Sequence, residues 1–298
     1  PITSTTALPH EFDNAIEVDN VLYSADGKRL LSINGDVEVL VVPDGTETIC
    51  DEAFNDLTNA RNEGQLRELI LPASLKEIGR NVFCGSISVI ENNSPSFICK
   101  DDMLLSRDGS ILYYYYGSST GEFSFSKDIH HIWSGAFISR KIKSINNGHS
   151  IYKIDSNPFL DVYSDEYRGH GITFRNEHNG NYQAGNDCLF FSRYWGEGPK
   201  LIGYYGSDMD VDLRDMDLEE IQKYAFFGSP VEKVYLPSSI KFIHREAFEW
   251  CFELKQIVVD EGQKDRFKLM LPIKLGKYVI EDKTHTTVGL DAENELPF

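Results

Sequence analysis

The sequence predicts a repeat solenoid, mainly β with short helical or 3-10 turns, in which a parallel sheet is interrupted by β-hairpins. Two observations lead to this prediction. A strand, proline and phenylalanine unit recurs along the chain at fixed offsets, and Asp-Gly turns between alternating apolar runs precede such units. One short strand cannot bury its apolar face alone, so neighbouring units must stack and share a continuous core.

The two clearest copies of the unit are residues 66–83 and 231–248, aligned on their prolines, with phenylalanine eleven residues after each proline. Proline ends a strand without leaving an unpaired donor, and the phenylalanine is expected to fill the coil interior. Six apolar positions coincide between the two copies: Leu66/Val231, Leu69/Val234, Leu71/Leu236, Leu75/Ile240, Ile78/Ile243 and Phe83/Phe248.

Four further stretches repeat the unit less completely. Residues 37–54 carry Thr46 where the other copies have Leu or Ile, and residues 121–137 carry Ser126 in place of the proline. In residues 211–226, Val211 and Leu213 lie one residue out of phase, which predicts a register slip or bulge in that strand. Residues 254–262 repeat only the strand half and are expected to form the last coil.

Three hairpins are predicted between the repeats, at residues 22–31, 104–117 and 189–206. The first two carry Asp-Gly between alternating apolar runs, a strong local hairpin signal, and the third has a longer tip. Each hairpin precedes a repeat unit, so the chain is expected to alternate a hairpin with one or two coils.

The repeat pattern L-x-x-[IV]-x-[LI]-P-x-S-[LI]-x-x-I-x-x-x-[AV]-F resembles the BspA-type leucine-rich repeat over residues 37–83, 121–137 and 211–271. The resemblance implies a right-handed solenoid with a leucine-rich-repeat-like parallel sheet on one face. Such folds occur in many bacterial surface and adhesion proteins that bind other proteins or matrix. It therefore favours an extracellular or cell-surface location, but it supplies no ligand, because function depends on sites added to a fold.

We expect a single leucine-rich-repeat-like domain over residues 1–298. Residues 155–187 are rich in Asn, Gly, Asp and Tyr and are expected to form a long surface loop. Residues 264–271 have helical spacing and predict a capping helix. The expected parts are an N-terminal cap and hairpin (1–36), repeats with a hairpin (37–145), an insertion (146–188), a hairpin and repeats (189–262), and a C-terminal cap and tail (263–298).

The composition restricts the possible partners. At 298 residues and 41% hydrophobic content the chain can bury a large core, and its formal net charge of -18 disfavours nucleic acid and anionic lipid while favouring basic partners. No apolar run approaches the roughly 18 residues of a membrane span, so none is expected.

The cysteines and the first residues bear on the compartment. Five cysteines, an odd number without a C-x-x-C pair, predict mostly buried thiols and no disulfide framework or zinc site: Cys50, Cys84, Cys99, Cys188 and Cys251. Unpaired cysteines are compatible with the cytoplasm, so localisation stays open. The start, Pro1 to Ser4, is neither an initiator Met nor a basic leader, and we expect a trimmed N-terminus.

The preferred binding surface is an apolar stripe on the strand face. Side chains alternate along a strand, so Ile70 points outward between the inward Leu69 and Leu71. The alternative is that hairpins or the C-terminal segment cover the stripe. Its members, taken at the same repeat position, are Val41, Ile70, Ser124, Tyr235 and Val258.

A second candidate surface consists of the hairpin aromatics, which include Tyr113 to Tyr116, Tyr204 and Tyr205. Exposed tyrosine and tryptophan suit both protein interfaces and sugar stacking, and Tyr194 and Trp195 lie at a predicted hairpin tip. In alternating strands at least half of these rings must face a core. Glycan binding is therefore kept as an alternative to protein binding.

Enzyme motifs are weak, and no catalytic residue, metal site or cofactor is expected. Residues 117–121 fit G-x-S-x-G, but a strand pattern follows where a nucleophile elbow needs a helix. His130 and His131 are expected at the surface, and the aspartates at 208, 210 and 212 are expected to form a solvated acidic edge. The sequence thus predicts a non-catalytic scaffold for protein interaction or adhesion, with a structural spacer or assembly module as a further alternative.

Overall fold

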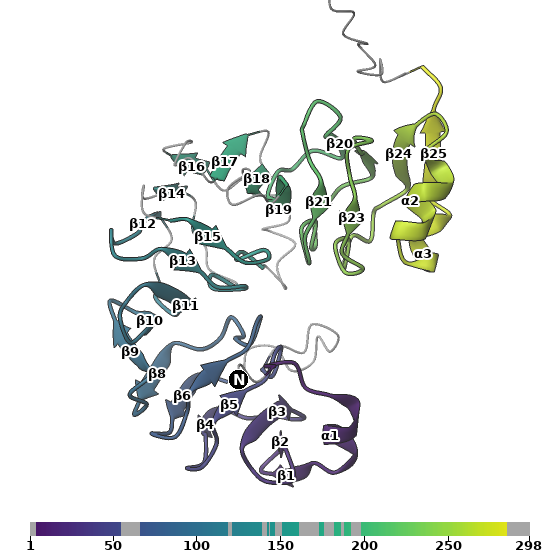
Figure 1. Cartoon of the computed structure of the whole chain (residues 1–298). Helices are drawn as coiled ribbons and strands as arrows, with labels where there is room; N and C mark the ends of the chain where they lie inside the picture. Colours follow the sequence, from purple (N-terminus) through teal and green to yellow (C-terminus); the bar gives the residue numbers. More distant parts are fainter. Residues whose placement is uncertain are drawn as a thin grey trace, which may run out of the picture.

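The computed structural model describes residues 4–54, 66–118, 121–138, 142, 144–146, 151–160, 173–175, 182–185, 188–191 and 198–284. It is a β-solenoid bent into an arc, in which three units of similar design follow one another from the N-terminus to the C-terminus (Figure 1). This confirms the predicted repeat solenoid.

Each unit begins with a three-stranded antiparallel meander. Its last strand pairs in parallel with a short strand of the next coil, and that strand pairs in parallel with a short strand of the coil after it. We call these meander sheets 1, 2 and 3. Sheet 1 contains β1 (Ile16–Val18), β2 (Val21–Tyr23), β3 (Arg29–Ile33), β5 (Thr48–Ile49) and β7 (Glu77–Ile78). Sheet 2 contains β9 (Phe97–Lys100), β10 (Met103–Ser106), β11 (Ile111–Tyr115), β13 (His131–Ile132) and β15 (Lys153–Ile154). Sheet 3 contains β17 (Tyr182–Gly185), β18 (Cys188–Phe191), β19 (Lys200–Tyr204), β21 (Glu220–Ile221) and β23 (Phe242–Ile243).

The opposite wall of the coils is formed by three all-parallel sheets, one per unit, which we call parallel sheets 1, 2 and 3. Parallel sheet 1 contains β4 (Val39–Val41), β6 (Glu68–Leu71) and β8 (Val89–Asn92). Parallel sheet 2 contains β12 (Glu122–Ser124), β14 (Ser144–Asn146) and β16 (Thr173–Arg175). Parallel sheet 3 contains β20 (Asp210–Asp212), β22 (Lys233–Tyr235), β24 (Gln256–Asp260) and β25 (Val279–Asp282).

The coils are built as the repeat pattern predicts. The carbonyls of Pro43, Pro72 and Pro237 each accept a hydrogen bond from the backbone N–H three residues later, which closes a turn after the strand. Ser126 makes the same turn with Ile129, so the proline is replaceable there. The marker phenylalanines are all buried and lie in the core: Phe54, Phe83, Phe137, Phe226 and Phe248.

The predicted bulge near Val211 is absent from the strand pairing. Asp210, Val211 and Asp212 pair with Lys233, Val234 and Tyr235 in unbroken parallel register. The extra residue of this repeat lies in the following turn, where Leu213 and Leu218 are both fully buried although one more residue separates them than in the other copies. A turn can absorb one residue without exposing the core face of the strand, whereas a slip would turn that face outward.

The expected insertion at 146–188 belongs in part to the solenoid. β15 adds to meander sheet 2, and β16 pairs in parallel with β14 in parallel sheet 2. The prediction of a surface loop over 155–187 is therefore wrong for β16 and for β17, which pairs with β18. The Asn- and Gly-rich composition hid strands of only a few residues, because such short strands carry little periodicity.

Aromatic side chains of the meanders join one unit to the next. Tyr114 of the second unit is fully buried and stacks on Phe83 of the first at a centroid distance of 4.4 Å. Its hydroxyl donates to the carbonyl of Cys84 at 2.9 Å. Tyr205 of the third unit donates to the Asn157 side chain of the second at 2.8 Å. These rings continue the core across the unit boundaries.

A polar cluster also links the first and third units. The ammonium of Lys223 pairs with the Glu52 carboxylate and, at 2.8 Å, with Glu246. The Tyr224 hydroxyl donates to Glu52 at 3.0 Å, although Glu52 lies about 170 residues earlier in the chain. Tyr224 and Phe227 also pack into the core cluster of the first unit. The cluster therefore holds two distant coils together across the arc.

Two short helices cover the last coils, where the sequence predicted one capping helix. α2 (Lys264–Met270) buries Phe267 in the core of the third unit and is followed by α3 (Ile273–Gly276). The guanidinium of Arg266 donates to the carbonyls of Ile240 and Ser238 and so fixes α2 on the last coils. β25 then adds a parallel strand that the sequence reading did not predict. At the other end, α1 (Pro9–Asp13) precedes the first meander.

Candidate binding surface

The predicted stripe is divided among the three parallel sheets. Val41 and Ile70 are paired neighbours in parallel sheet 1, and Tyr235 and Val258 are paired in parallel sheet 3. Ser124, on β12 of parallel sheet 2, is paired with Asn146, which is not a member of the stripe. These sheets are not joined by hydrogen bonds in the described part of the chain. The candidate surface must therefore be evaluated sheet by sheet.

Parallel sheet 1 exposes an apolar patch in two rows. One row runs Val39, Glu68, Val89 and the next runs Val41, Ile70, Glu91 across β4, β6 and β8. Val39, Val41 and Val89 are 49%, 60% and 50% exposed, and Ile70 is half-buried between its neighbours. We call these six residues the sheet-1 patch. It is the most apolar of the three strand faces.

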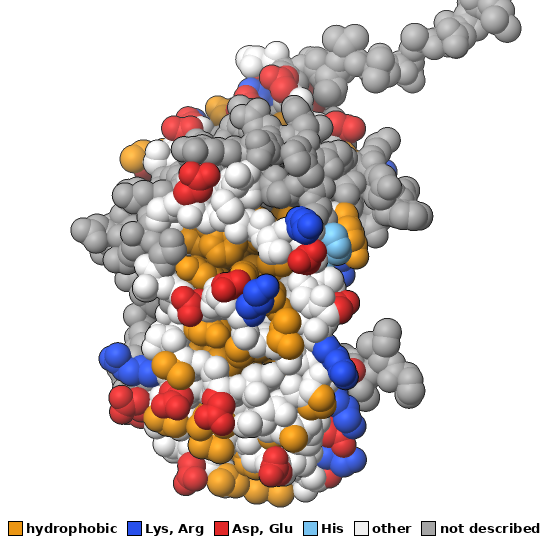
Figure 2. All heavy atoms as spheres, turned by 90° about the vertical axis from the view of Figure 1, so that its left-hand side faces the viewer, with side chains coloured by type: hydrophobic (Ala, Val, Ile, Leu, Met, Phe, Trp, Pro, Cys, Tyr) orange, Lys and Arg blue, Asp and Glu red, His pale blue; other side chains and the backbone are white. Residues whose placement is uncertain are grey.

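Acidic side chains surround the sheet-1 patch. Figure 2 shows that hydrophobic and acidic side chains alternate over the lower part of this side of the molecule, while Lys and Arg lie toward its margins. Glu38, next to β4, has a mostly exposed side chain and only a loose ion pair with Arg67 at 3.9 Å. An apolar surface with a negative rim is complementary to a partner that carries apolar and basic side chains.

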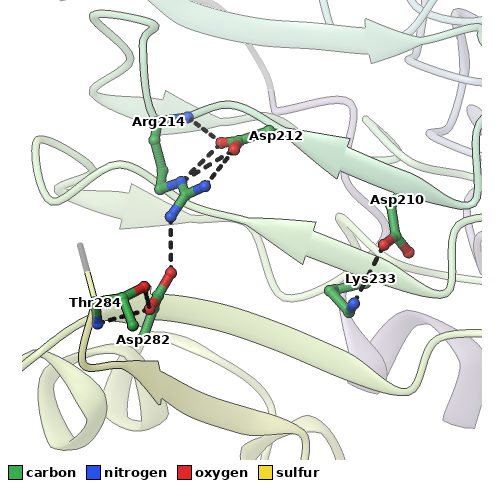
Figure 3. Close-up of polar contacts among 6 residues, drawn as sticks. All are labelled: Asp210, Asp212, Arg214, Lys233, Asp282 and Thr284. Carbon is green, nitrogen blue, oxygen red and sulfur yellow. Dashed lines mark hydrogen bonds and ion pairs between the residues drawn. The ribbon is translucent and has the colours of Figure 1, made fainter.

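Parallel sheet 3 presents a different face, because ion pairs cover it (Figure 3). The guanidinium of Arg214 donates to Asp212 at 2.9 Å and to Asp282 at 2.9 Å, and it lies over the Tyr235 ring at 4.4 Å. Lys233 pairs with Asp210 at 3.1 Å, and this hydrogen bond raises the pKa of the lysine. Asp208, Asp210 and Asp212 are exposed at or beside the edge strand β20, as expected, and two of them, Asp210 and Asp212, are paired with basic side chains.

Val258 does not contribute to an exposed stripe. It lies between Tyr235 and Ile280 on the central strand β24 and is only 4% exposed, so its assignment to the binding surface is wrong. A valine flanked by longer side chains on both neighbouring strands is enclosed by them. Alternation of side chains predicts the face toward which a residue points, but not how far the side chains on neighbouring strands extend from the sheet.

A shallow groove of about 310 Å³ lies beside this face, at the ends of β20, β22 and β24. Arg214 forms part of its wall together with Asp215, Asp217, Ser238 and Asp260. Because Arg214 already pairs with two carboxylates, it is not available to attract an anionic ligand. The groove therefore adds no separate binding chemistry.

The hairpin aromatics whose side chains are described are largely core residues. Tyr114, Tyr115, Tyr204 and Tyr205 are all buried. Tyr194 and Trp195, the two rings expected at a hairpin tip, lie outside the described residues. The packing alternative is correct for the four buried tyrosines, which are not available to stack on a sugar.

The burial of His131 was not predicted from the sequence. It was expected at the surface, but it is buried on β13, and its Nε2 lies 3.2 Å from Asp155 Oδ2. Burial opposes ionisation of Asp155, yet its contacts with His131, Lys153 and Arg80 lower the pKa of the carboxyl. The two short strands β13 and β15 bring the pair together, a contact that the linear spacing did not indicate.

The cysteines differ in their environment. Cys50 is buried, and burial raises the pKa of its thiol to about 11. Cys251 donates to the Phe226 carbonyl at 2.8 Å, and burial raises its pKa to about 12, as suits a structural thiol. Cys99 is exposed, against the expectation of buried thiols.

The structure describes only part of the weak enzyme motifs. β12 follows the G-x-S-x-G segment where a nucleophile elbow requires a helix, and Ser119 itself lies outside the described residues. Cys188 with His170 and His178 could in principle form a thiol-imidazole pair or a metal site, and the side chains of these three residues also lie outside the described part of the chain. Within the described part of the chain there is no group of three or more metal-ligating side chains and no helix long and apolar enough to cross a membrane.

Comparison with known proteins identifies the repeats. The model of the BspA-type leucine-rich repeat region matches six copies over residues 33–164 and 210–267. Comparison with curated proteins gives no match.

Among solved structures, the chain is similar to the pneumococcal vaccine antigen PcpA at 18% identity and a TM-score of 0.36, over 77% of this chain and 48% of that one. It thus spans about half the length of the antigen. A leucine-rich cell surface protein of Faecalibacterium prausnitzii is 14% identical, with a TM-score of 0.31 and coverage of 83% and 88%. A leucine-rich repeat protein of Eubacterium ventriosum is 14% identical, with a TM-score of 0.41 and coverage of 82% and 65%.

The matched residues include most of the coils that build the parallel sheets. Because the family model covers more than half of the sequence, this chain belongs to the BspA-type leucine-rich repeat family.

Proposed function

We propose that this protein is a non-catalytic scaffold that binds another protein through the sheet-1 patch. The observation that carries the proposal is a set of three valines, about half exposed, on the two outer strands of one three-stranded sheet, with half-buried Ile70 on the strand between them. A contiguous exposed apolar patch on a rigid face, rimmed by polar residues, is typical of a protein interaction site.

The charge of the patch indicates the kind of partner. Glu68 and Glu91 lie within it, Glu38 lies beside it, and the whole chain has a formal net charge of -18. A partner that places apolar side chains on the valines and Lys or Arg on the glutamates matches both features. Glycan binding is less well supported, because four of the described hairpin tyrosines are buried.

The test compares wild-type protein with a Val41→Asp, Ile70→Asp variant. Because Val41 is 60% exposed and Ile70 half-buried on the open face, we expect the variant to fold, which circular dichroism checks. A partner captured by the wild type from bacterial extract is purified, and its affinity for both proteins is measured by interferometry. We expect affinity to fall about tenfold or more, as for loss of a central apolar contact.

The matched control is a Met209→Asp, Phe242→Asp variant, which places the same charges on two exposed apolar side chains outside the sheet-1 patch. This control should bind as the wild type does. Equal affinity of the wild type and the patch variant would show that the sheet-1 patch is not the binding surface.

A further inference from the structure

The two tips of the arc expose apolar side chains with opposite charges around them. The N-terminal tip consists of α1 and β1, and the C-terminal tip of α2 and α3 (Figure 1). Neither tip overlaps the sheet-1 patch. The structure therefore holds a second pair of surfaces that the proposed function does not use.

At the N-terminal tip, four large hydrophobic side chains are exposed by more than two fifths: Leu8, Phe12, Ile16 and Val18. All three residues of β1 are exposed, and in the described part of the chain β1 has β2 as its single strand neighbour. A sheet edge with apolar side chains is a site where another chain can dock. We call these four residues the N-terminal edge.

This exposure does not result from a loose terminus. The Glu11 carboxylate pairs with Arg29 at 2.8 Å and accepts the backbone N–H of Leu8 at 2.8 Å. Arg29 also donates to the carbonyls of Ser4 and Thr6, and the backbone N–H of Asp51 donates to Thr5. The segment is fixed on the first coil with its apolar side chains outward.

The charges around the N-terminal edge are acidic. Asp13, Glu17 and Asp19 are all exposed, and each follows one of the four hydrophobic residues directly in the sequence. None of the three forms an ion pair within 4 Å among the described residues. Glu11, by contrast, is neutralised by Arg29. A docking partner must therefore supply basic groups next to apolar ones.

At the C-terminal tip, Leu269 and Ile273 are 89% and 98% exposed. They lie on the side of the helices away from the core, because Phe267 and Leu271 point inward and are buried. Arg266 and Glu281 fix this cap through hydrogen bonds to backbone groups, so its outer face is held in place.

The outer face of the cap is mainly basic. Lys268, Lys274 and Lys277 are exposed around Leu269 and Ile273, while Asp265 is the exposed acid of α2. Lys274 makes one ion pair, with Glu249 at 3.4 Å, and its side chain is still two thirds exposed. We call these three lysines with Leu269 and Ile273 the C-terminal cap face. Its apolar and basic side chains are complementary to the apolar and acidic side chains at the N-terminal tip.

We propose that the N-terminal edge of one molecule docks on the C-terminal cap face of a second copy of this chain. The apolar residues of the two surfaces meet, and the acids of the edge face the lysines of the cap. Because the two surfaces differ, the contact is head-to-tail. A second copy is the favoured occupant because one chain carries both complementary surfaces at opposite tips.

Charge reversal tests this contact. Sedimentation velocity between about 10 µM and 1 mM measures self-association of the full chain. The edge variant carries Asp13→Lys and Glu17→Lys, and the cap variant carries Lys268→Glu and Lys277→Glu. Each variant has tips of like charge, so we expect the dissociation constant of the head-to-tail contact to rise about tenfold relative to the wild type.

Two combinations make the result specific. The chain with all four reversals retains the formal net charge of -18 and should associate as the wild type does. An equimolar mixture of the edge and cap variants should form a mixed dimer, although each alone associates weakly. Ile273→Asp, at a 98% exposed position that folding does not require, should weaken association without changing the fold.

The proposal is overturned if the wild type stays monomeric over the whole range. It is also overturned if the reversals leave association unchanged, or if the fourfold reversal fails to restore it while circular dichroism shows a folded chain. None of these three results affects the sheet-1 patch, since no residue of that patch is altered.

Discussion

At the scale of single residues, the buried pair of His131 and Asp155 makes the clearest prediction. Both side chains are less than a tenth exposed and lie 3.2 Å apart, with Lys153 3.4 Å from the same carboxylate. Asp155→Asn removes the buried carboxylate charge that faces His131 and Lys153. A hydrogen bond to a charged group contributes about 1.5–3 kcal/mol, so we expect the substitution to lower the free energy of unfolding by about 2 kcal/mol at pH 7.

The same substitution gives a pH test. The pKa of Asp155 is lowered in the folded protein, so its contribution is fully present above the ordinary carboxyl pKa and is lost as the pH falls from there through the lowered pKa of the folded protein. Urea unfolding of both proteins at pH 7 and near pH 3 measures the difference between them. The difference should shrink at the lower pH. An equal difference at both values would contradict the ion-pair interpretation.

At the scale of elements, tyrosines of the meanders pack at the boundaries between neighbouring units and stabilise them. Tyr114 is fully buried, stacks on Phe83 and bonds the Cys84 carbonyl. Tyr114→Ala should lower the free energy of unfolding by about 3–5 kcal/mol, because a large cavity forms between two units. Tyr114→Phe should cost only about 1 kcal/mol, because it removes one hydrogen bond. Urea denaturation measures both values, and similar losses would show that packing is not the main contribution.

The coils and the three hairpins could be predicted from the sequence, because their signals are local. Pro72 and Phe83 recur at fixed offsets, and the Asp-Gly turns give glycine a positive φ at Gly27 and Gly109. The first strand of each meander, β1, β9 or β17, was missed. In the first two meanders its turn has positive φ at Asp19, Asn20, Asp101 and Asp102, the pattern of a type I′ hairpin without glycine. An Asp-Asn or Asp-Asp pair between short apolar runs was the available signal.

The binding surface was only partly predictable. Alternation along the strand places Val41 and Ile70 outward correctly, and register pairs them. The burial of Val258, the ion pairs of Arg214 and the contact of His131 with Asp155 depend on neighbours from other coils. A repeat pattern does not specify which side chains meet across coils, since it describes each coil in isolation.

At the scale of the whole molecule, the Glu52, Lys223 and Glu246 cluster is expected to set the curvature of the arc. Glu52→Lys would place two ammonium groups together between the first and third units. We expect a larger radius of gyration by small-angle X-ray scattering and a lower melting temperature. Glu47→Lys, an exposed change on the same coil that loses pairs with Lys28 and Lys76, is the matched control and should leave the radius unchanged. An unchanged radius in Glu52→Lys would contradict this role.

Strand pairing confined to single units also bears on how the protein is made. Every strand pair of meander sheet 1 and parallel sheet 1 lies within residues 16–92. A ribosome that has released this segment has delivered all the partners that these two sheets need, before the second unit is translated. The nascent chain can therefore complete its hydrogen bonds in steps of about one unit, and each finished unit offers a surface on which the next meander closes.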